Sequence, residues 1–379
     1  MIEETPEIDT DHYGRQLAVF GAETMGRLIK MRVLIQGLNG IGIETAKNMV
    51  LAGPKRVTVH DSTLVTGPDL GTNFFLRDSH IGKVSRADAC ISSLQTLNHY
   101  VSVDSTSATI DETLLADYDL VVFTECHDRD LLVRLNHYCR AQEKPKGFIW
   151  TGGLGLFGYI FVDYGPNHTI FDANGNPLKT RVIESVTQAE KAIVRVIEDT
   201  RHGFDDGDWV EFTEVQGMSE LNAEKFKIET KTPFEIYIGD TTKFGKYTKS
   251  GYVTQVKVPI QKSWKSLEDA LKDPYGPGNK EMIDPDLDFM RFYKPLELHL
   301  YLNSMLDFVA QQGRLPAILN DSDAATYLNL VKARFDDYSK AEPSNSRAPR
   351  IDAIDENLIK NISQFAETQI PSNTGFYGG

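Results

Sequence analysis

The sequence has few cysteines, and their spacing excludes two kinds of site. Its 379 residues include only three, Cys90, Cys126 and Cys139, and no two of them form a CxxC pair. Such a set fits neither a disulfide framework nor a zinc site. We therefore expect a reducing compartment and no bound metal.

Long apolar runs and an excess of positive charge are also missing. No stretch of about 18 apolar residues exists that could span a bilayer, and the acidic start MIEETPEIDTDHY lacks the apolar core of a signal peptide. The formal net charge is -14. Because binding to phosphate backbones or anionic lipids depends on Lys and Arg, we expect neither nucleic acid nor membrane as a partner. The expected location is the cytoplasm and the nucleus.

What is present is enough apolar material for several cores, with 41% hydrophobic residues in a chain longer than one domain usually is. Five β-rich runs alternate with helical stretches near the front, at residues 32–37, 56–61, 101–106, 119–125 and 147–152. This alternation predicts an α/β fold with a doubly wound, mostly parallel, Rossmann-like sheet. Continuous apolar runs such as LVVF fit a sheet that is covered on both faces.

The pattern then changes twice, which predicts further domains. We expect residues 1–169 to form the Rossmann-like domain. Short β-rich runs broken by ANGNP, DDGD and GDTT predict an inserted small all-β domain over residues 170–260. Helical periodicity after Pro295 and after a capping candidate, Ser322, predicts a helical bundle over residues 261–345. Residues 346–379 are expected to return to the first domain.

A glycine cluster, VLIQGLNGIG, follows the first predicted strand. In a GxGxxG dinucleotide loop the three glycines allow a tight turn, close approach of phosphate and close helix packing. Here Gly37 and Gly42 keep the outer places, Asn39 holds the middle one, and a glycine comes one residue late at Gly40. Asp61 ends the next strand, where a carboxylate could accept hydrogen bonds from a ribose. From these residues alone, both a nucleotide site and a purely structural turn stay open.

Longer stretches of the sequence resemble one enzyme family. The stretches that carry the resemblance are YGRQ with the following glycine loop and IGK, then LGLFGYIFVDYG, RHGFDDGDWVEFTEVQGMSELN, GYVTQVKVP and SWKSLEDAL. Together they resemble ubiquitin-activating enzymes over nearly the whole chain. These enzymes are similar to a fused pair of adenylating domains, of which the first is catalytically inactive, and this chain resembles that inactive copy. The resemblance implies that residues 170–260 are a first catalytic-cysteine half-domain and that the chain is a truncated N-terminal portion, ending within a landmark seen here as FYGG.

The resemblance also implies that the nucleotide site is vestigial. Active copies carry a second carboxylate two residues after the ribose-binding acid, and an Asn and Arg further on, whereas this chain has Thr63, Gly71 and Thr72 in those places. Without these groups nothing binds magnesium, and nothing neutralises the negative charge that develops on the pyrophosphate. The remaining members of the site, none of them expected to bind nucleotide here, are Gly37, Gly40, Gly42, Asp61 and Lys83.

Arg15 is the one residue to which the resemblance gives a catalytic role. In the family the arginine of Tyr-Ser-Arg-Gln reaches across to the ATP of the active half, and Arg15 in YGRQ matches it, with Gly14 in place of the serine. A planar guanidinium suits several phosphate oxygens at once. The alternative is an ordinary surface ion pair.

For the intact enzyme the resemblance implies ATP and magnesium as cofactors, with ubiquitin and ubiquitin-conjugating enzymes as partners. Such an enzyme adenylates the ubiquitin C-terminus, captures ubiquitin as a thioester and passes it on. The active adenylation domain and the catalytic-cysteine domain would lie outside this chain, so no cysteine here is catalytic. Two alternatives stay open: the smaller subunit of a heterodimeric enzyme that activates a modifier such as SUMO, and an NAD-dependent oxidoreductase.

Overall fold

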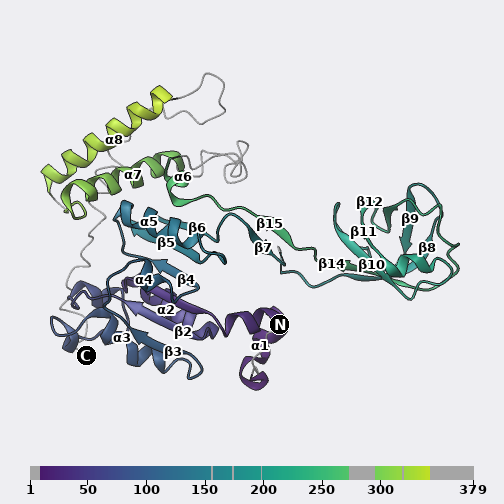
Figure 1. Ribbon diagram of the computed structural model, residues 1–379, viewed down its shortest axis with the longest axis horizontal. Coiled ribbons are helices and arrows are strands. Elements are labelled where there is room, and N and C mark those ends of the chain that lie inside the picture. The colour runs from purple at the N-terminus through teal and green to yellow at the C-terminus, as the bar shows by residue number, and fades with distance from the viewer. Residues whose placement is uncertain are drawn as a thin grey trace, which may run out of the picture. The chain divides into compact units, whose positions relative to one another are not determined.

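The computed structural model describes residues 9–154, 157–172, 175–197, 199–272, 295–317 and 320–341. The chain divides into two compact units (Figure 1). Unit 2 is Asn167–Lys262, and unit 1 comprises the residues before and after it. The domain boundaries expected at residues 169, 260 and 345 stay a prediction, and the predicted return segment 346–379 lies outside the described residues.

A six-stranded sheet forms the centre of unit 1, in the order β3-β2-β1-β4-β5-β6. Its first five members in the chain are parallel, and β6 runs antiparallel to β5. The strands are β1 (Arg32–Gln36), β2 (Arg56–His60), β3 (Ser102–Ser105), β4 (Leu120–Phe123), β5 (Gly147–Leu154) and β6 (Phe157–Asp163). All five predicted strands are therefore confirmed, as is the doubly wound α/β fold.

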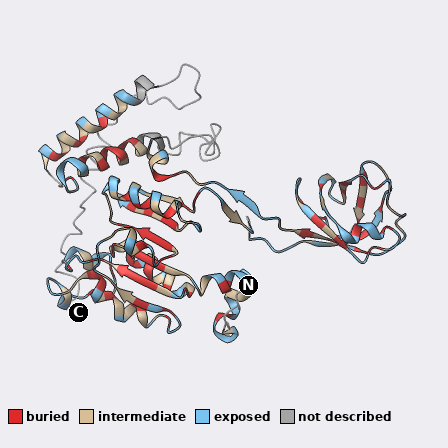
Figure 2. Cartoon of the chain, in the orientation of Figure 1, coloured by how far each residue is buried: buried red, intermediate tan, exposed pale blue. Residues whose placement is uncertain are grey.

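Helices cover both faces of this sheet. Alternate residues of β1 show it, because Val33 and Ile35 belong to one apolar core while Leu34 belongs to another. Helices α2 (Gly40–Ala52) and α3 (Arg86–Gln95) contribute to the first core, and α5 (Arg129–Arg140) contributes to the second. The buried residues of the central strands β1, β2 and β4 are red in Figure 2. Short helices connect the strands: α4 (Glu112–Leu115), η1 (Pro68–Gly71) and η2 (Asp78–His80).

Unit 2 contains a seven-stranded antiparallel sheet in the order β11-β10-β14-β8-β9-β13-β12. The strands are β8 (Thr180–Val186), β9 (Ala192–Val196), β10 (Trp209–Thr213), β11 (Lys225–Lys227), β12 (Glu229–Thr232), β13 (Glu235–Gly239) and β14 (Tyr252–Val256), with η3 (Ser219–Ala223) between them. At the two ends of unit 2, β7 (His168–Ile170) pairs antiparallel with β15 (Ile260–Lys262) and forms a two-stranded ribbon. The predicted all-β insertion is confirmed.

Helices return after unit 2, as predicted. They are α6 (Leu267–Lys272), α7 (Pro295–Gln312) and α8 (Asp321–Ala341), and an apolar cluster that includes Tyr301, Met305 and Tyr327 packs α7 against α8. The predicted cap of α8 was wrong by two residues. Asn320 Oδ1 accepts the hydrogen bonds of the first amides, from Ser322 N at 3.1 Å and Asp323 N at 3.2 Å.

Within the described residues, no helix is both long enough and apolar enough to cross a membrane.

Candidate functional site: a closed nucleotide loop

The glycine loop joins β1 to α2, where a Rossmann-like fold holds a nucleotide. Gly37 has φ +85°, a left-handed conformation that glycine adopts readily, and it makes the tight turn. Gly42 lies so close to the loop that an added Cβ would be 1.9 Å from Gly37 O. Gly40 faces Thr72, whose Cβ would be 3.2 Å from an added Cβ. The first and last glycines thus keep the roles of turn and close packing.

Asn39 occupies the place where a phosphate would need bare backbone. It caps α2, because its Oδ1 accepts the hydrogen bond of Gly42 N at 3.1 Å. Phosphates bind helix N-termini through such free amides. The side chain of Asn39 therefore satisfies a donor that a phosphate would otherwise use.

Asp61 is nearly buried, and its carboxylate already has partners. Oδ2 accepts from Leu38 N at 2.9 Å and Oδ1 from Thr63 N at 3.0 Å. Arg86 Nε lies 3.3 Å from Oδ2. The carboxylate that could bind a ribose instead ties the glycine loop to the end of β2.

Arg86 is the residue at this site that the sequence did not reveal. Its side chain is 10% exposed, and it lies among three carboxylates: Glu125 at 2.7 Å, Asp61 at 3.3 Å and Asp69 at 3.9 Å. These acids follow β2 and β4, whose carboxyl ends meet at the usual ligand crevice of an open α/β sheet. One guanidinium among three carboxylates leaves a negative excess, which disfavours a triphosphate.

Glu125, the acid nearest to Arg86, has a shifted pKa. Burial raises the pKa of its carboxyl above the ordinary value; Arg86 opposes the rise, and Asp61 and Asp69 add to it. A raised native pKa gives stability below the ordinary carboxyl pKa that is lost as pH rises through the native pKa. We expect the unfolding free energy of Glu125→Gln, relative to the unsubstituted chain, to increase between about pH 4 and pH 7. Urea titrations across that range measure it, and a difference that stays constant or decreases would contradict it.

The other expected members of the site lie around the loop without completing it. Thr63, Gly71 and Thr72, which the resemblance assigns to the places of magnesium and triphosphate contacts, carry no charge, and Thr72 lies beside Gly40. Lys83 is exposed in the turn before α3. None of these side chains is a carboxylate, and the two carboxylates that lie near Asp61, those of Asp69 and Glu125, surround Arg86 with it. Because no group of His, Cys, Asp and Glu among the described residues is placed to hold a metal ion, the site does not fit a magnesium nucleotide.

Arg15 lies on α1 (Thr10–Leu28), outside the loop. It is exposed, and within the part of the chain that the structure describes its guanidinium has no hydrogen bond or ion pair. The surface ion pair that would be its ordinary role is absent among these residues. Its guanidinium is thus free to contact a group outside the described residues.

Burial disfavours the thiolate form of all three cysteines. Burial raises the thiol pKa of Cys90 and Cys126 to about 11 and that of Cys139 to about 12, so none is a thiolate near neutral pH. His202 is buried, and both ring nitrogens bind backbone: Nδ1 accepts from Phe204 N at 2.9 Å and Nε2 lies 2.7 Å from Thr232 O. Within the described ranges no group of His, Cys, Asp and Glu could hold a metal ion.

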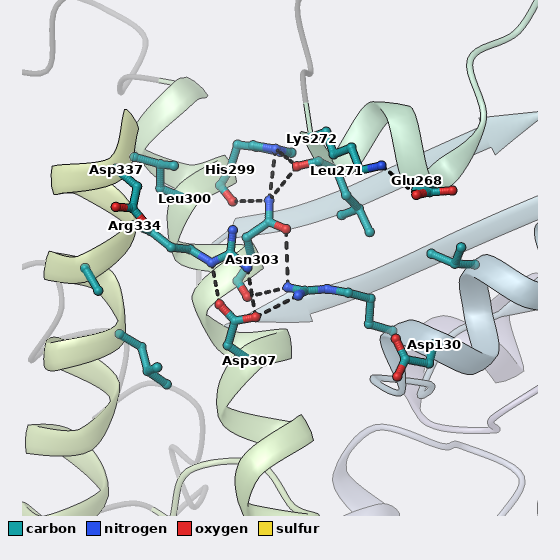
Figure 3. Close-up of a pocket in the computed structure, with 14 residues that line it drawn as sticks. Asp130, Glu268, Leu271, Lys272, His299, Leu300, Asn303, Asp307, Arg334 and Asp337 are labelled. Atoms are coloured by element: carbon teal, nitrogen blue, oxygen red, sulfur yellow. Dashed lines mark hydrogen bonds and ion pairs between the residues drawn. The ribbon is translucent and has the colours of Figure 1, made fainter. Parts of the chain in front are cut away.

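A separate groove of about 740 Å³ lies among α5, α6, α7 and α8. Two of its arginines converge on Asp307, which accepts from Arg129 NH1 at 2.7 Å and Arg334 NH2 at 2.8 Å (Figure 3). Burial raises the pKa of Asp307, but these two arginines outweigh it and hold that pKa below its ordinary value. Both guanidinium groups share this carboxylate, and Lys272 pairs with Glu268. Among the described lining residues, the groove therefore offers no unpaired Lys or Arg to a ligand.

Two family models match the chain. One is described as the ubiquitin-activating enzyme E1 FCCH domain and matches residues 189–257, and the other, the ubiquitin-activating enzyme E1 four-helix bundle, matches residues 258–334. Among solved structures, that of E. coli MccB with MccA-N7isoASN aligns at TM-score 0.35 and 19% identity, over 42% of this chain and 48% of its own.

Curated relatives match nearly the whole chain. Ubiquitin-activating enzyme E1 1 of Arabidopsis thaliana is 36% identical over 98% of this chain and 33% of its own length. Ubiquitin-like modifier-activating enzyme 1 of Homo sapiens is 35% identical over 98% of this chain and 34% of its own. The chain thus spans about a third of the length of the curated relatives that it matches. By these matches, the chain is similar over nearly its whole length to about a third of a ubiquitin-activating enzyme.

Proposed function

We propose that this chain is the N-terminal, non-catalytic portion of an enzyme that adenylates the ubiquitin C-terminus with Mg-ATP. The same enzyme would then form a ubiquitin thioester and pass ubiquitin to a conjugating enzyme. Adenylation converts an unreactive carboxylate into an acyl donor with AMP as the leaving group. In this proposal ubiquitin, conjugating enzymes and the active adenylation and catalytic-cysteine domains are the partners, and the enzyme acts in the cytoplasm and nucleus.

The observation that carries the non-catalytic assignment is the closed loop. Asn39 caps the amide that a phosphate would use, and Asp61 is held by Leu38 N and Arg86. The resemblance places a second, magnesium-binding carboxylate where this chain has Thr63, and no group of His, Cys, Asp and Glu among the described residues is placed to hold a metal ion. Within the described loop, adenylation therefore lacks both the Gly42 amide, which could bind a nucleotide phosphate, and a metal site whose cation would stabilise the departing pyrophosphate.

Calorimetric titration of ATP into this chain tests the closed loop. We expect no heat of binding with or without magnesium at chain concentrations of about 0.1 mM, which excludes dissociation constants in the micromolar range. A parallel titration without magnesium separates a built site from loose association of the anion with surface lysines. Tight, magnesium-dependent binding would overturn the assignment.

Arg15 is proposed to contact the ATP of the active half. Its exposure on α1 and its lack of a partner within the described residues support this role. A charge-assisted hydrogen bond contributes about 1.5–3 kcal/mol, which corresponds to roughly 10- to 100-fold in rate. We expect Arg15→Ala to slow ubiquitin-dependent pyrophosphate exchange by the intact enzyme to that extent. Arg15→Lys, which keeps the charge but not the planar fork, should recover part of the rate, and unchanged exchange in Arg15→Ala would remove the role.

The second candidate is the smaller subunit of a heterodimeric enzyme for a modifier such as SUMO. The resemblance implies that such subunits lack the inserted β domain, and the match of residues 189–257 to the FCCH domain therefore disfavours it. Reading the gene past residue 379 separates the two: a second adenylating domain with an intact Asp-x-Asp pair and a cysteine domain supports the first candidate. An NAD-dependent oxidoreductase is disfavoured because Asn39 replaces the middle glycine of the loop and already binds the amide of Gly42.

A further inference from the structure

The start of α1 is attached to unit 1 through one buried side chain. Gly21 interrupts the helix with φ +76° and ψ 163°, which separates residues 10–20 from the rest of α1. Among residues 10–20 only Tyr13 is buried, at 5% exposure. Because most of the other side chains of this segment are exposed, the position of the segment depends largely on where Tyr13 lies.

Tyr13 lies in a notch that only glycine can form. Gly53 ends α2 with φ +89°, and an added Cβ there would be 2.8 Å from both Cε1 and the hydroxyl oxygen of Tyr13. Asn98 Nδ2 donates to the Tyr13 hydroxyl at 3.5 Å and to Val50 O at 3.1 Å. The ring of Tyr13 is thus packed directly on the backbone of α2, the helix that begins at the glycine loop.

A second, exposed contact fixes the direction of the segment. Asp9 caps α1 through Oδ1, which accepts from Asp11 N and His12 N at 3.0 Å each. Its other oxygen, Oδ2, accepts from the Tyr100 hydroxyl at 2.5 Å. The rings of His12 and Tyr100 also lie 4.7 Å apart. The first turn of α1 is therefore held at its cap as well as at Tyr13.

These two contacts determine which face of the helix is free. Residues two apart on a helix point in directions about 160° apart, so Arg15 points away from the face that Tyr13 buries. Val19, four residues on from Arg15, lies on the same face and is 75% exposed. Tyr13 thereby directs Arg15 outward, away from the core of unit 1.

We propose that Tyr13, seated on Gly53, is the positioning residue for Arg15. It does not touch nucleotide; it holds the helix turn that presents the guanidinium, and the Asp9–Tyr100 contact assists it. The inference rests on the proposed function, because it concerns how this chain delivers Arg15 to a site in the active half. Since a misplaced guanidinium loses the same contact as a deleted one, Tyr13→Ala and Arg15→Ala have the same kinetic consequence.

The test is a double-mutant cycle in the intact enzyme. Ubiquitin-dependent pyrophosphate exchange is measured for Tyr13→Ala, Arg15→Ala and the double variant. We expect Tyr13→Ala to lower kcat about 10-fold or more with the KM for ubiquitin unchanged, and the double variant to be no slower than Arg15→Ala. Tyr13→Phe keeps the ring in the notch and restores the rate. Gly14→Ala, in open space between the two residues, keeps full activity.

Hydrogen exchange on the 379-residue chain supplies a readout that does not depend on activity. In Tyr13→Ala the amides of residues 14–20 should exchange at least 10-fold faster, while those of β1 stay protected. If Arg15→Ala leaves pyrophosphate exchange unchanged, the proposed role of Arg15 and this inference both fall. If Arg15→Ala slows the reaction but Tyr13→Ala does not, or if the two effects multiply, only the positioning role is overturned.

Discussion

Replacing Gly42 with alanine is expected to lower the unfolding free energy of unit 1 by about 3 kcal/mol or more. The added Cβ would be 1.9 Å from Gly37 O, 2.8 Å from Gly37 C and 2.9 Å from Thr124 Oγ1. Two of these atoms are backbone, so no rotation of a side chain relieves the overlap. Either the loop or α2 must move, and both are built into the central core.

Gly40→Ala is the matched control, because it adds the same methyl group two residues earlier. Its nearest neighbour would be Thr72 Cβ at 3.2 Å, a side-chain atom beside an exposed turn. We expect a loss below about 1 kcal/mol. Chemical denaturation followed by near-ultraviolet circular dichroism measures both variants. Equal losses would show that close packing of α2 on the loop is not what Gly42 provides.

This contrast explains how far the glycine loop could be read from the sequence. The outer glycines were expected to keep their places, and Gly37 and Gly42 do make the tight turn and the close approach. Asn39 could have been recognised further, since Asn before a helical run is a usual N-cap. A side chain at that position was expected to interfere with phosphate, and its bond to Gly42 N gives the physical reason.

Arg86 could not have been found in this way. Its partners come from separate connections, Asp61 and Asp69 after β2 and Glu125 after β4, and only the strand order β2-β1-β4 brings them together. Tyr13 was missed for the same reason, because the notch at Gly53 lies 40 residues along the chain, at the end of another helix. Local patterns predicted the strands and the helical faces. They carry no information on contacts that depend on which strand ends are neighbours.

The largest single loss is expected for Asp163→Ala, at about 3–5 kcal/mol. Asp163 is 1% exposed, and its two oxygens accept from Arg140 NH1 at 2.7 Å, Asn136 Nδ2 at 2.8 Å and Gly165 N at 2.7 Å. Arg140 NH1 also donates to Trp264 O at 3.0 Å. Asp163 and its partner Arg140 together therefore join α5 to both chain segments of unit 1 that flank the inserted β domain. Without it a guanidinium stays largely buried with no counter-charge.

Two further variants separate the buried charge from the loss of side-chain volume. Asp163→Asn keeps one acceptor oxygen and removes the charge, so its loss should lie between that of Asp163→Ala and zero. Glu23→Ala removes an exposed ion pair with Arg27, in which the Glu23 side chain is 76% exposed. It should lower the unfolding free energy by less than about 0.5 kcal/mol. Urea unfolding of the three variants ranks them. If Asp163→Ala cost no more than Glu23→Ala, solvent would have to satisfy Arg140 and Asn136, and the junction would not depend on a buried ion pair.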